Sequence, residues 1–90
     1  MEFKDNQIAI IAISLQLDKE GKYRQYSLSE LVTGSEIFKK IKTLAKDDHV
    51  VDWELDLTSE EKVFIVKYID DKTWTIWDAE AVLSVKELLK

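Results

Sequence analysis

Residues 49–77 read HVVDWELDLTSEEKVFIVKYIDDKTWTIW, and this stretch decides the expected fold. Apolar and acidic side chains alternate strictly along its first part, which places the two kinds on opposite faces of an extended strand. The apolar set is Val51, Trp53, Leu55 and Leu57, and the acidic set is Asp52, Glu54 and Asp56. We therefore expect a strand with one buried face and one solvated, acidic face.

Two more strands are predicted to follow and to complete an antiparallel meander. Residues 62–69 are rich in β-branched and aromatic side chains, which favour extended structure. Residues 70–72 interrupt this run, and residues 74–77 are predicted to form a short third strand. The competing interpretation makes residues 59–69 a helix, because Thr58 followed three residues later by Glu61 matches a capping box.

The apolar stretch at residues 7–18 is also assigned to a strand. On a helix its isoleucine and leucine side chains would point in all directions, whereas on a strand most of them share one face. Four isoleucines within residues 8–13 favour extended structure as well, because branching at Cβ restricts the side chain in a helix. A turn at residues 18–22, with Gly21 in the left-handed conformation, would then lead into a return strand at residues 23–27.

Two helices complete the expected fold. Residues 27–32 would form a single helical turn that Gly34 stops, and Ser35 would cap a helix that runs through Lys46. A second helix of about 12 residues would begin near Asp78 and bury an apolar face. Either Asp78 or Thr75 would cap it, and Ala81, Val82, Val85, Leu88 and Leu89 would form that face.

The predicted fold class is α+β. It is a mostly antiparallel sheet of about five strands with two helices on one face, in the order ββαβββα. The alternative is a mainly α-helical fold in which residues 59–69 are helical.

The chain is predicted to be a single domain spanning residues 1–90, because this length supports one core. Residues 8–46 and 50–90 resemble two copies of a strand–strand–helix unit. Residues 17–23 align with residues 57–63, and residues 36–46 align with residues 80–90. Chance similarity between two amphipathic helices is the alternative explanation.

Charge is distributed unevenly along the chain, which has a net charge of −5. Residues 1–46 hold eight Lys and Arg against six Asp and Glu, a net charge of +2, whereas residues 47–90 hold five against twelve, a net charge of −7. The acidic half would repel a polyanion, which argues against direct binding of DNA or RNA. The chain contains no Cys, which fits a reducing compartment.

No segment is expected to enter a membrane, and the expected location is the cytoplasm. The longest apolar run, residues 8–13, is far shorter than the about 20 residues that span a bilayer. The first five residues lack the basic start and the cleavage site of a signal peptide.

Catalytic chemistry has little support in the sequence. His49 is the only histidine, and an isolated histidine is more often an ordinary surface residue than a general base or a metal ligand. The acidic side chains at positions 52, 54 and 56 would lie about 6.5–7 Å apart on a strand, but no glycine follows them as in a calcium loop. We therefore expect no catalytic, cofactor-binding or metal-binding residues and no enzymatic activity.

Binding to a protein partner is the expected function. Among the tryptophans, Trp53 belongs to the apolar side of its strand, whereas Trp74 and Trp77 have opposite parity, so Trp77 is expected at the surface. The candidate partner-binding face consists of Asp52, Glu54, Asp56, Glu60, Glu61 and Trp77.

The chain is thus interpreted as a small acidic protein-binding module, in one version an inhibitor that mimics nucleic acid on a basic partner. Its composition is typical of accessory proteins encoded by phages and mobile elements. One alternative is a structural homo-oligomer, such as a homodimer. Another is a helix-turn-helix regulator, which requires residues 58–69 and 75–89 both to be helical.

Overall fold

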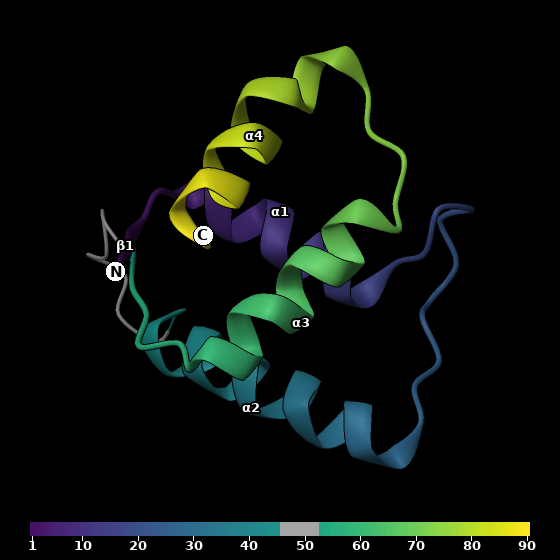
Figure 1. The fold of residues 1–90 in the computed structure, drawn as a ribbon, viewed down its shortest axis with the longest axis vertical. Coiled ribbons are helices and arrows are strands. Elements are labelled where there is room, and N and C mark those ends of the chain that lie inside the picture. The colour runs from purple at the N-terminus through teal and green to yellow at the C-terminus, as the bar shows by residue number, and fades with distance from the viewer. Residues whose placement is uncertain (46–52) are drawn as a thin grey trace.

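The computed structural model describes residues 1–45 and 53–90, which form four α-helices (Figure 1). The helices are α1 (Asp5–Gln16), α2 (Leu28–Ala45), α3 (Ser59–Asp70) and α4 (Ala79–Leu88), and a 3₁₀ turn, η1 (Ile76–Asp78), leads directly into α4. The one sheet in the described residues pairs two short antiparallel strands, β1 (Glu2–Phe3) and β2 (Trp53–Glu54). The prediction of a five-stranded α+β sheet is therefore wrong, and the mainly α-helical alternative is correct.

α1 is the central helix of the fold, and the strand predicted at residues 7–18 is wrong. It packs against α2, α3 and α4, and Figure 1 shows it behind α3 with α4 above and α2 below. A helix that is apolar on most sides is one that other elements surround. The scatter of apolar side chains, which seemed to exclude a helix, is the signature of this central position. Its buried residues are Ile8, Ile10, Ile11, Ser14 and Leu15.

α3 takes the place of the strand predicted at residues 62–69. The capping box forms as its sequence suggested: the Glu61 N–H donates to Thr58 Oγ1 at 3.1 Å, and the Thr58 N–H donates to Glu61 Oε1 at 2.8 Å. Phe64 and Ile65 turn into the core, whereas Val63 is exposed. A satisfied helix start and a buried helical face thus outweigh β propensity, which depends strongly on context.

The alternating stretch has the expected inner and outer sides but not the expected sheet. Leu55 and Leu57 are buried, and Glu54 and Asp56 are exposed. Regular pairing covers only Trp53 and Glu54, which lie opposite Phe3 and Glu2. The third strand predicted at residues 74–77 is wrong, because this segment is a loop that enters η1. Val51 and Asp52 lie outside the described residues.

The turn at residues 18–22 is confirmed, although it follows a helix instead of a strand. Gly21 has a φ of 79°, and Asp18 Oδ1 accepts the N–H groups of Glu20 and Lys22 at 2.8 and 3.0 Å. The return strand predicted at residues 23–27 is wrong, because only an isolated bridge between Leu17 and Tyr23 forms.

α2 is longer than predicted, because it starts at Leu28 and passes through Gly34. The Leu31 N–H donates to the Ser27 carbonyl at 2.8 Å, so the predicted short turn and the predicted helix are one element. Gly34 does not stop the helix. Its α-carbon faces Phe64, and a Cβ at this position would lie 3.7 Å from the Phe64 ring.

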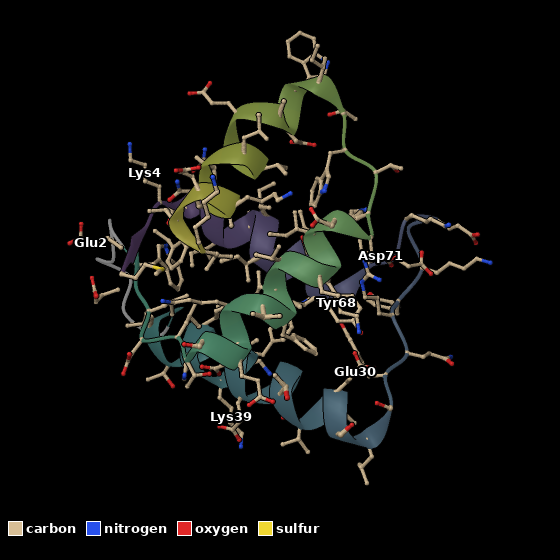
Figure 2. The ribbon with its side chains drawn as sticks, viewed as in Figure 1. Glu2, Lys4, Glu30, Lys39, Tyr68 and Asp71 are labelled. Carbon is tan, nitrogen blue, oxygen red and sulfur yellow. The ribbon has the colours of Figure 1, made fainter. Side chains whose placement is uncertain are left out.

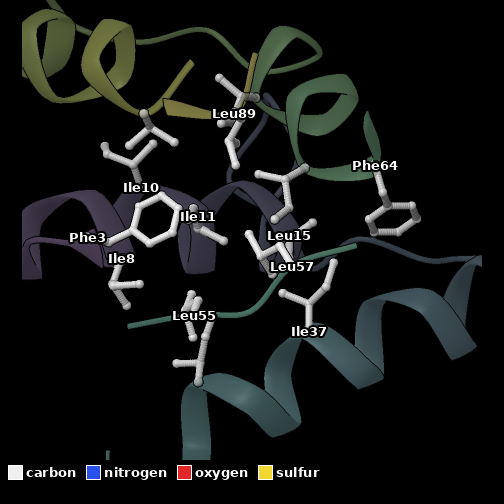
Figure 3. Close-up of a cluster of buried hydrophobic side chains, with 14 of the residues drawn as sticks. Phe3, Ile8, Ile10, Ile11, Leu15, Ile37, Leu55, Leu57, Phe64 and Leu89 are labelled. Atoms are coloured by element: carbon white, nitrogen blue, oxygen red, sulfur yellow. The ribbon is translucent and has the colours of Figure 1, made fainter. Parts of the chain in front are cut away.

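The hydrophobic core surrounds α1 and receives side chains from every helix (Figure 3). α4 begins where predicted, and its expected inner face is largely confirmed: Val82, Val85 and Leu89 are buried, but Leu88 is 36% exposed. Neither proposed cap of α4 donates or accepts a capping bond to its backbone; Thr75 Oγ1 bonds to the Asp78 carboxylate instead, at 3.1 Å. The internal repeat stays a prediction, although the strands assigned to its two copies do not form as expected.

Candidate functional site

The predicted acidic face does not form a continuous row in the described residues. Glu54 pairs with the amino group of Met1, and Asp56 and Glu60 are exposed. Asp52 lies outside the described residues. Without the strand that spaced them, these carboxylates belong to β2, to the loop that follows it and to the start of α3.

Glu61 is a structural residue and not a surface ligand, because its side chain is only 7% exposed. It accepts a bond from Lys40 Nζ at 2.6 Å, in addition to the bond from the Thr58 N–H. Burial raises the pKa of Glu61, but the hydrogen bonds from Lys40 and Thr58 outweigh burial and hold that pKa below its usual value. Lys40 also donates to the Asp56 carbonyl at 2.7 Å and so ties α2 to the segment before α3.

Trp77 is the one predicted site residue that stands out in the structure, with 91% of its surface exposed. Ile76 beside it is 85% exposed, and Leu83, about two helical turns after Ile76, is 65% exposed. We call these three residues the α4 corner. Glu80, also exposed, lies between them in sequence, one turn from each end of the set.

The other tryptophans anchor the fold, as the sequence suggested for Trp53. The Trp53 indole N–H donates to the Asp5 carboxylate. The Trp74 indole N–H donates to the Ile69 carbonyl at 3.0 Å, and its ring packs against the core. Trp74 and Trp77 therefore differ in exposure, and Trp77 is the exposed one as predicted, although the strand on which that prediction was based does not form.

A second apolar surface, which was not predicted from the sequence, lies along α2. Leu28 is 79% exposed and Leu31 is 52% exposed. Leu31 begins a groove of about 400 Å³ whose α2 wall also includes Ser35, Phe38 and Lys42. We call this the α2 groove. The intervals of three, four and three residues from Leu28 to Phe38 are the sequence signal that could have revealed it.

The facing wall of the α2 groove is formed by the end of α1 and by residues 23–26. Tyr26 is fixed there, because its hydroxyl donates to the Leu15 carbonyl at 2.5 Å and its ring lies 6.0 Å from Phe64 and 5.2 Å from Tyr68. Burial raises the pKa of Tyr26 to about 12. Tyr23 is 81% exposed at the rim.

Arg24 holds this wall against α1 and α3. Its guanidinium donates to the Ser14 carbonyl at 2.7 Å, to the Tyr68 carbonyl at 3.2 Å and to Asp71 at 2.8 Å. It also lies over the Tyr68 ring, 4.7 Å from the centroid. The Arg24 side chain is only 6% exposed, so its charge serves the fold and is not free for a ligand.

Tyr68 and Glu30 connect α3 to the start of α2. Figure 2 shows Glu30 reaching from α2 toward Tyr68, with Asp71 further along the chain beside Tyr68. The Tyr68 hydroxyl donates to the Glu30 carboxylate, and Lys67 Nζ lies 3.1 Å from the same carboxylate. Burial, together with the bond to Glu30, raises the pKa of Tyr68 to about 12. The bonds from Tyr68 and Lys67 lower the pKa of Glu30.

Residues 1–45 and 53–90 contain no group of three or more His, Cys, Asp or Glu side chains arranged to hold a metal ion. His49 lies outside this part of the chain. Within the same part, no helix combines the length and the apolar character needed to cross a membrane. The expectations of no enzymatic activity and no cofactor stay predictions.

Comparison of the chain with protein-family models gave no match, and comparison with curated proteins and with solved structures gave none either.

Proposed function

We propose that this chain is a small non-enzymatic protein-binding module that binds its partner through the α4 corner. The observation that carries the proposal is the 91% exposure of Trp77 next to Ile76. A folded chain gains nothing from leaving a tryptophan in water, whereas tryptophan is the residue most enriched among the energetic centres of protein interfaces.

The charge around the α4 corner indicates the kind of partner. Residues 73–85 contain two carboxylates, Asp78 and Glu80, and no Lys or Arg, whereas Lys4 lines a pocket together with Trp77 and Glu80. With two carboxylates against one lysine, the complementary surface is an apolar pocket with more basic than acidic residues at its rim. A basic partner was also expected from the sequence. The proposed binding surface, however, lies at the start of α4 and not on the face of a sheet.

The size of the expected effect follows from the area that Trp77 would bury. A tryptophan buries about 150–250 Å², which at about 25 cal/mol per Å² corresponds to about 4–6 kcal/mol before the costs of association. Truncation of such a residue typically costs about 2 kcal/mol or more. We therefore expect Trp77→Ala to weaken binding by about 30-fold or more.

Affinity capture from an extract of the host cells tests the proposal. Wild-type protein, Trp77→Ala and Val63→Ala would be immobilised in parallel, and bound proteins would be eluted by stepwise salt. Val63 is the matched control, because it is 71% exposed on α3, away from the α4 corner. We expect a partner that wild type and Val63→Ala retain and that Trp77→Ala loses. Equal retention by all three proteins would contradict the proposal.

Salt separates this proposal from nucleic-acid mimicry, the version that the acidic composition first suggested. An apolar contact through Trp77 should survive about 0.5 M salt, which screens exposed charges. A partner that elutes below that concentration and is indifferent to Trp77 would favour mimicry. Mimicry has the weaker support, because Glu61 is buried and Glu54 is paired. An accessory protein of a phage or mobile element, located in the cytoplasm, remains the proposed context.

The helix-turn-helix alternative meets its first condition, because α3 and α4 are both helical. Its charge remains unsuitable: Glu80 and Glu87 are exposed on α4, where a recognition helix would approach phosphates. We expect no specific retardation of duplex DNA at physiological salt.

A homo-oligomer, the structural alternative, would be revealed by a sedimentation measurement at micromolar concentration.

A further inference from the structure

The α2 groove shares no lining residue with the α4 corner and plays no part in the function proposed above. The residues that line it all lie between positions 15 and 42. The charged side chains that line it are Arg24 and Lys42, whereas the α4 corner has Asp78 and Glu80 with Lys4 nearby. The groove is therefore the more basic of the two surfaces and should select a different partner.

The shape of the groove fits a helix. Leu31, Ser35, Phe38 and Lys42 follow one another on α2 at intervals of four, three and four residues, the spacing by which two helices pack along each other. These residues span about 16 Å of helix axis. Ser35 leaves a small notch between two larger side chains, into which a partner side chain can fit. A volume of about 400 Å³ admits a row of side chains from one face of a helix.

Three of the polar side chains that line the groove, Ser35, Tyr26 and Arg24, are already bonded within the fold. The Ser35 hydroxyl donates to the Val32 carbonyl at 2.9 Å, and Tyr26 donates to Leu15. Arg24 has three partners of its own. Apolar side chains could therefore enter beside these three residues without leaving their donors unpaired, a cost that commonly weakens binding.

The charges at the groove select an acidic occupant. None of the described residues that line it is Asp or Glu. Lys42 is exposed at one end, and its ammonium group forms no ion pair among the described residues. The two carboxylates directly adjacent in sequence to lining residues of α2 are already paired: Glu30 with Lys67 at 3.1 Å, and Glu36 with Lys39 at 3.3 Å.

We propose that the α2 groove binds an acidic amphipathic helix of a partner protein. The helix inserts apolar side chains, spaced i, i+4 and i+7, between α2 and residues 23–26, and places a carboxylate beside Lys42. Because the α4 corner is not part of this contact, the protein can hold two partners at once.

Two synthetic helical peptides test the proposal on ¹⁵N-labelled protein by NMR. Both carry leucines at i, i+4 and i+7; one has Glu and the other has Lys at the flanking positions. The Glu peptide should shift the amide signals of Leu31, Ser35 and Lys42. The Lys peptide should bind at least about fivefold more weakly at low salt.

Three variants separate the groove from the α4 corner. Lys42→Glu should reverse the preference between the peptides, and Leu31→Ala should weaken the Glu peptide by about fivefold or more, since Leu31 is a half-exposed wall residue. Trp77→Ala should bind the Glu peptide as wild type does. A failure of the groove proposal can therefore be distinguished from a failure of the proposed function. Thermal unfolding would verify that each variant is folded.

Three outcomes would overturn the proposal. The first is that the Glu peptide leaves the groove signals unshifted, and the second is that both peptides bind equally to wild type and to Lys42→Glu. The third is a shift of the same signals with protein concentration in the absence of peptide, because that would assign the groove to a second copy of the chain.

Discussion

Replacing Glu61 tests the two interactions that stabilise the start of α3, the capping box with Thr58 and the ion pair with Lys40. Glu61→Ala removes the return bond of the capping box and leaves Lys40 without its 2.6 Å partner. Breaking a buried ion pair costs about 3–5 kcal/mol, but Lys40 is one-third exposed and can regain water. We therefore expect a loss of about 2–3 kcal/mol in the free energy of unfolding.

Glu61→Gln is the matched control, because glutamine can still complete the capping box but carries no charge. We expect it to cost about 1 kcal/mol, or about 4–8 °C in Tm for a domain of this size. Urea and thermal unfolding followed by circular dichroism at pH 7 would measure both variants. Equal stability of wild type and Glu61→Ala would contradict the structural role of Glu61, and equal losses in the two variants would contradict a separate contribution of the cap.

The stability difference between wild type and Glu61→Gln should depend on pH. The pKa of Glu61 is lowered in the folded state, so its charge stabilises the fold at pH values above the unfolded pKa of about 4.3. This contribution is lost as the pH falls through the folded pKa. The difference between wild type and Glu61→Gln should therefore be complete at pH 7 and shrink below about pH 4.

Three further predictions concern the core, the glycine of α2 and the tyrosines. Ile11→Ala, at 0% exposure, should cost about 2–5 kcal/mol in urea unfolding, and Ile13→Ala, at 38%, should cost about 1 kcal/mol or less; similar losses would contradict a central α1. Gly34→Ala should raise Tm, because its Cβ would make an ordinary 3.7 Å contact in a helix where alanine is preferred by about 0.5–1 kcal/mol. Tyr26 and Tyr68 should stay protonated at about pH 11 in an absorbance titration, and Tyr→Phe variants would identify their transitions near 12; ionisation of either tyrosine near pH 10 would contradict its burial.

The error at α1 shows what periodicity can and cannot decide. A single apolar face is expected only of a helix with solvent on one side. α1 has neighbours on several sides, so Ile8, Ile10 and Ile11 are all buried although they point in different directions. From the sequence alone, this pattern cannot be distinguished from a buried strand, and the β-branched isoleucines favoured the wrong choice.

At α3, the competing interpretation of residues 59–69 as a helix was the correct one. The capping box from Thr58 to Glu61 is a local signal with a direct mechanism, whereas the β propensity of residues 63–66 depends on a sheet being available. No sheet with more than two strands exists in the described residues. Gly34 was also misread, because a glycine can be accommodated inside a helix and α2 continues through it.

The candidate site was predicted in part. Trp77 is exposed as predicted, but the parity argument is not the reason, because Trp74 lies in a loop and Trp77 in η1 instead of in one strand. The acidic set was less successful, because burial of Glu61 depends on Lys40 of another helix. The α2 groove was missed because its residues are interleaved on α2 with Ile37 and Ile41, which face the core.

The most direct test of the proposed binding surface is whether Trp77 becomes buried when the partner binds. Protein labelled with 5-fluorotryptophan gives one ¹⁹F signal for each of its three tryptophans, and Trp77→Phe identifies the signal of Trp77. Adding the fraction captured by wild-type protein should shift or broaden this signal and leave those of Trp53 and Trp74 nearly unchanged. Binding that leaves the Trp77 signal where it was would contradict the assignment of the α4 corner as the partner-binding surface.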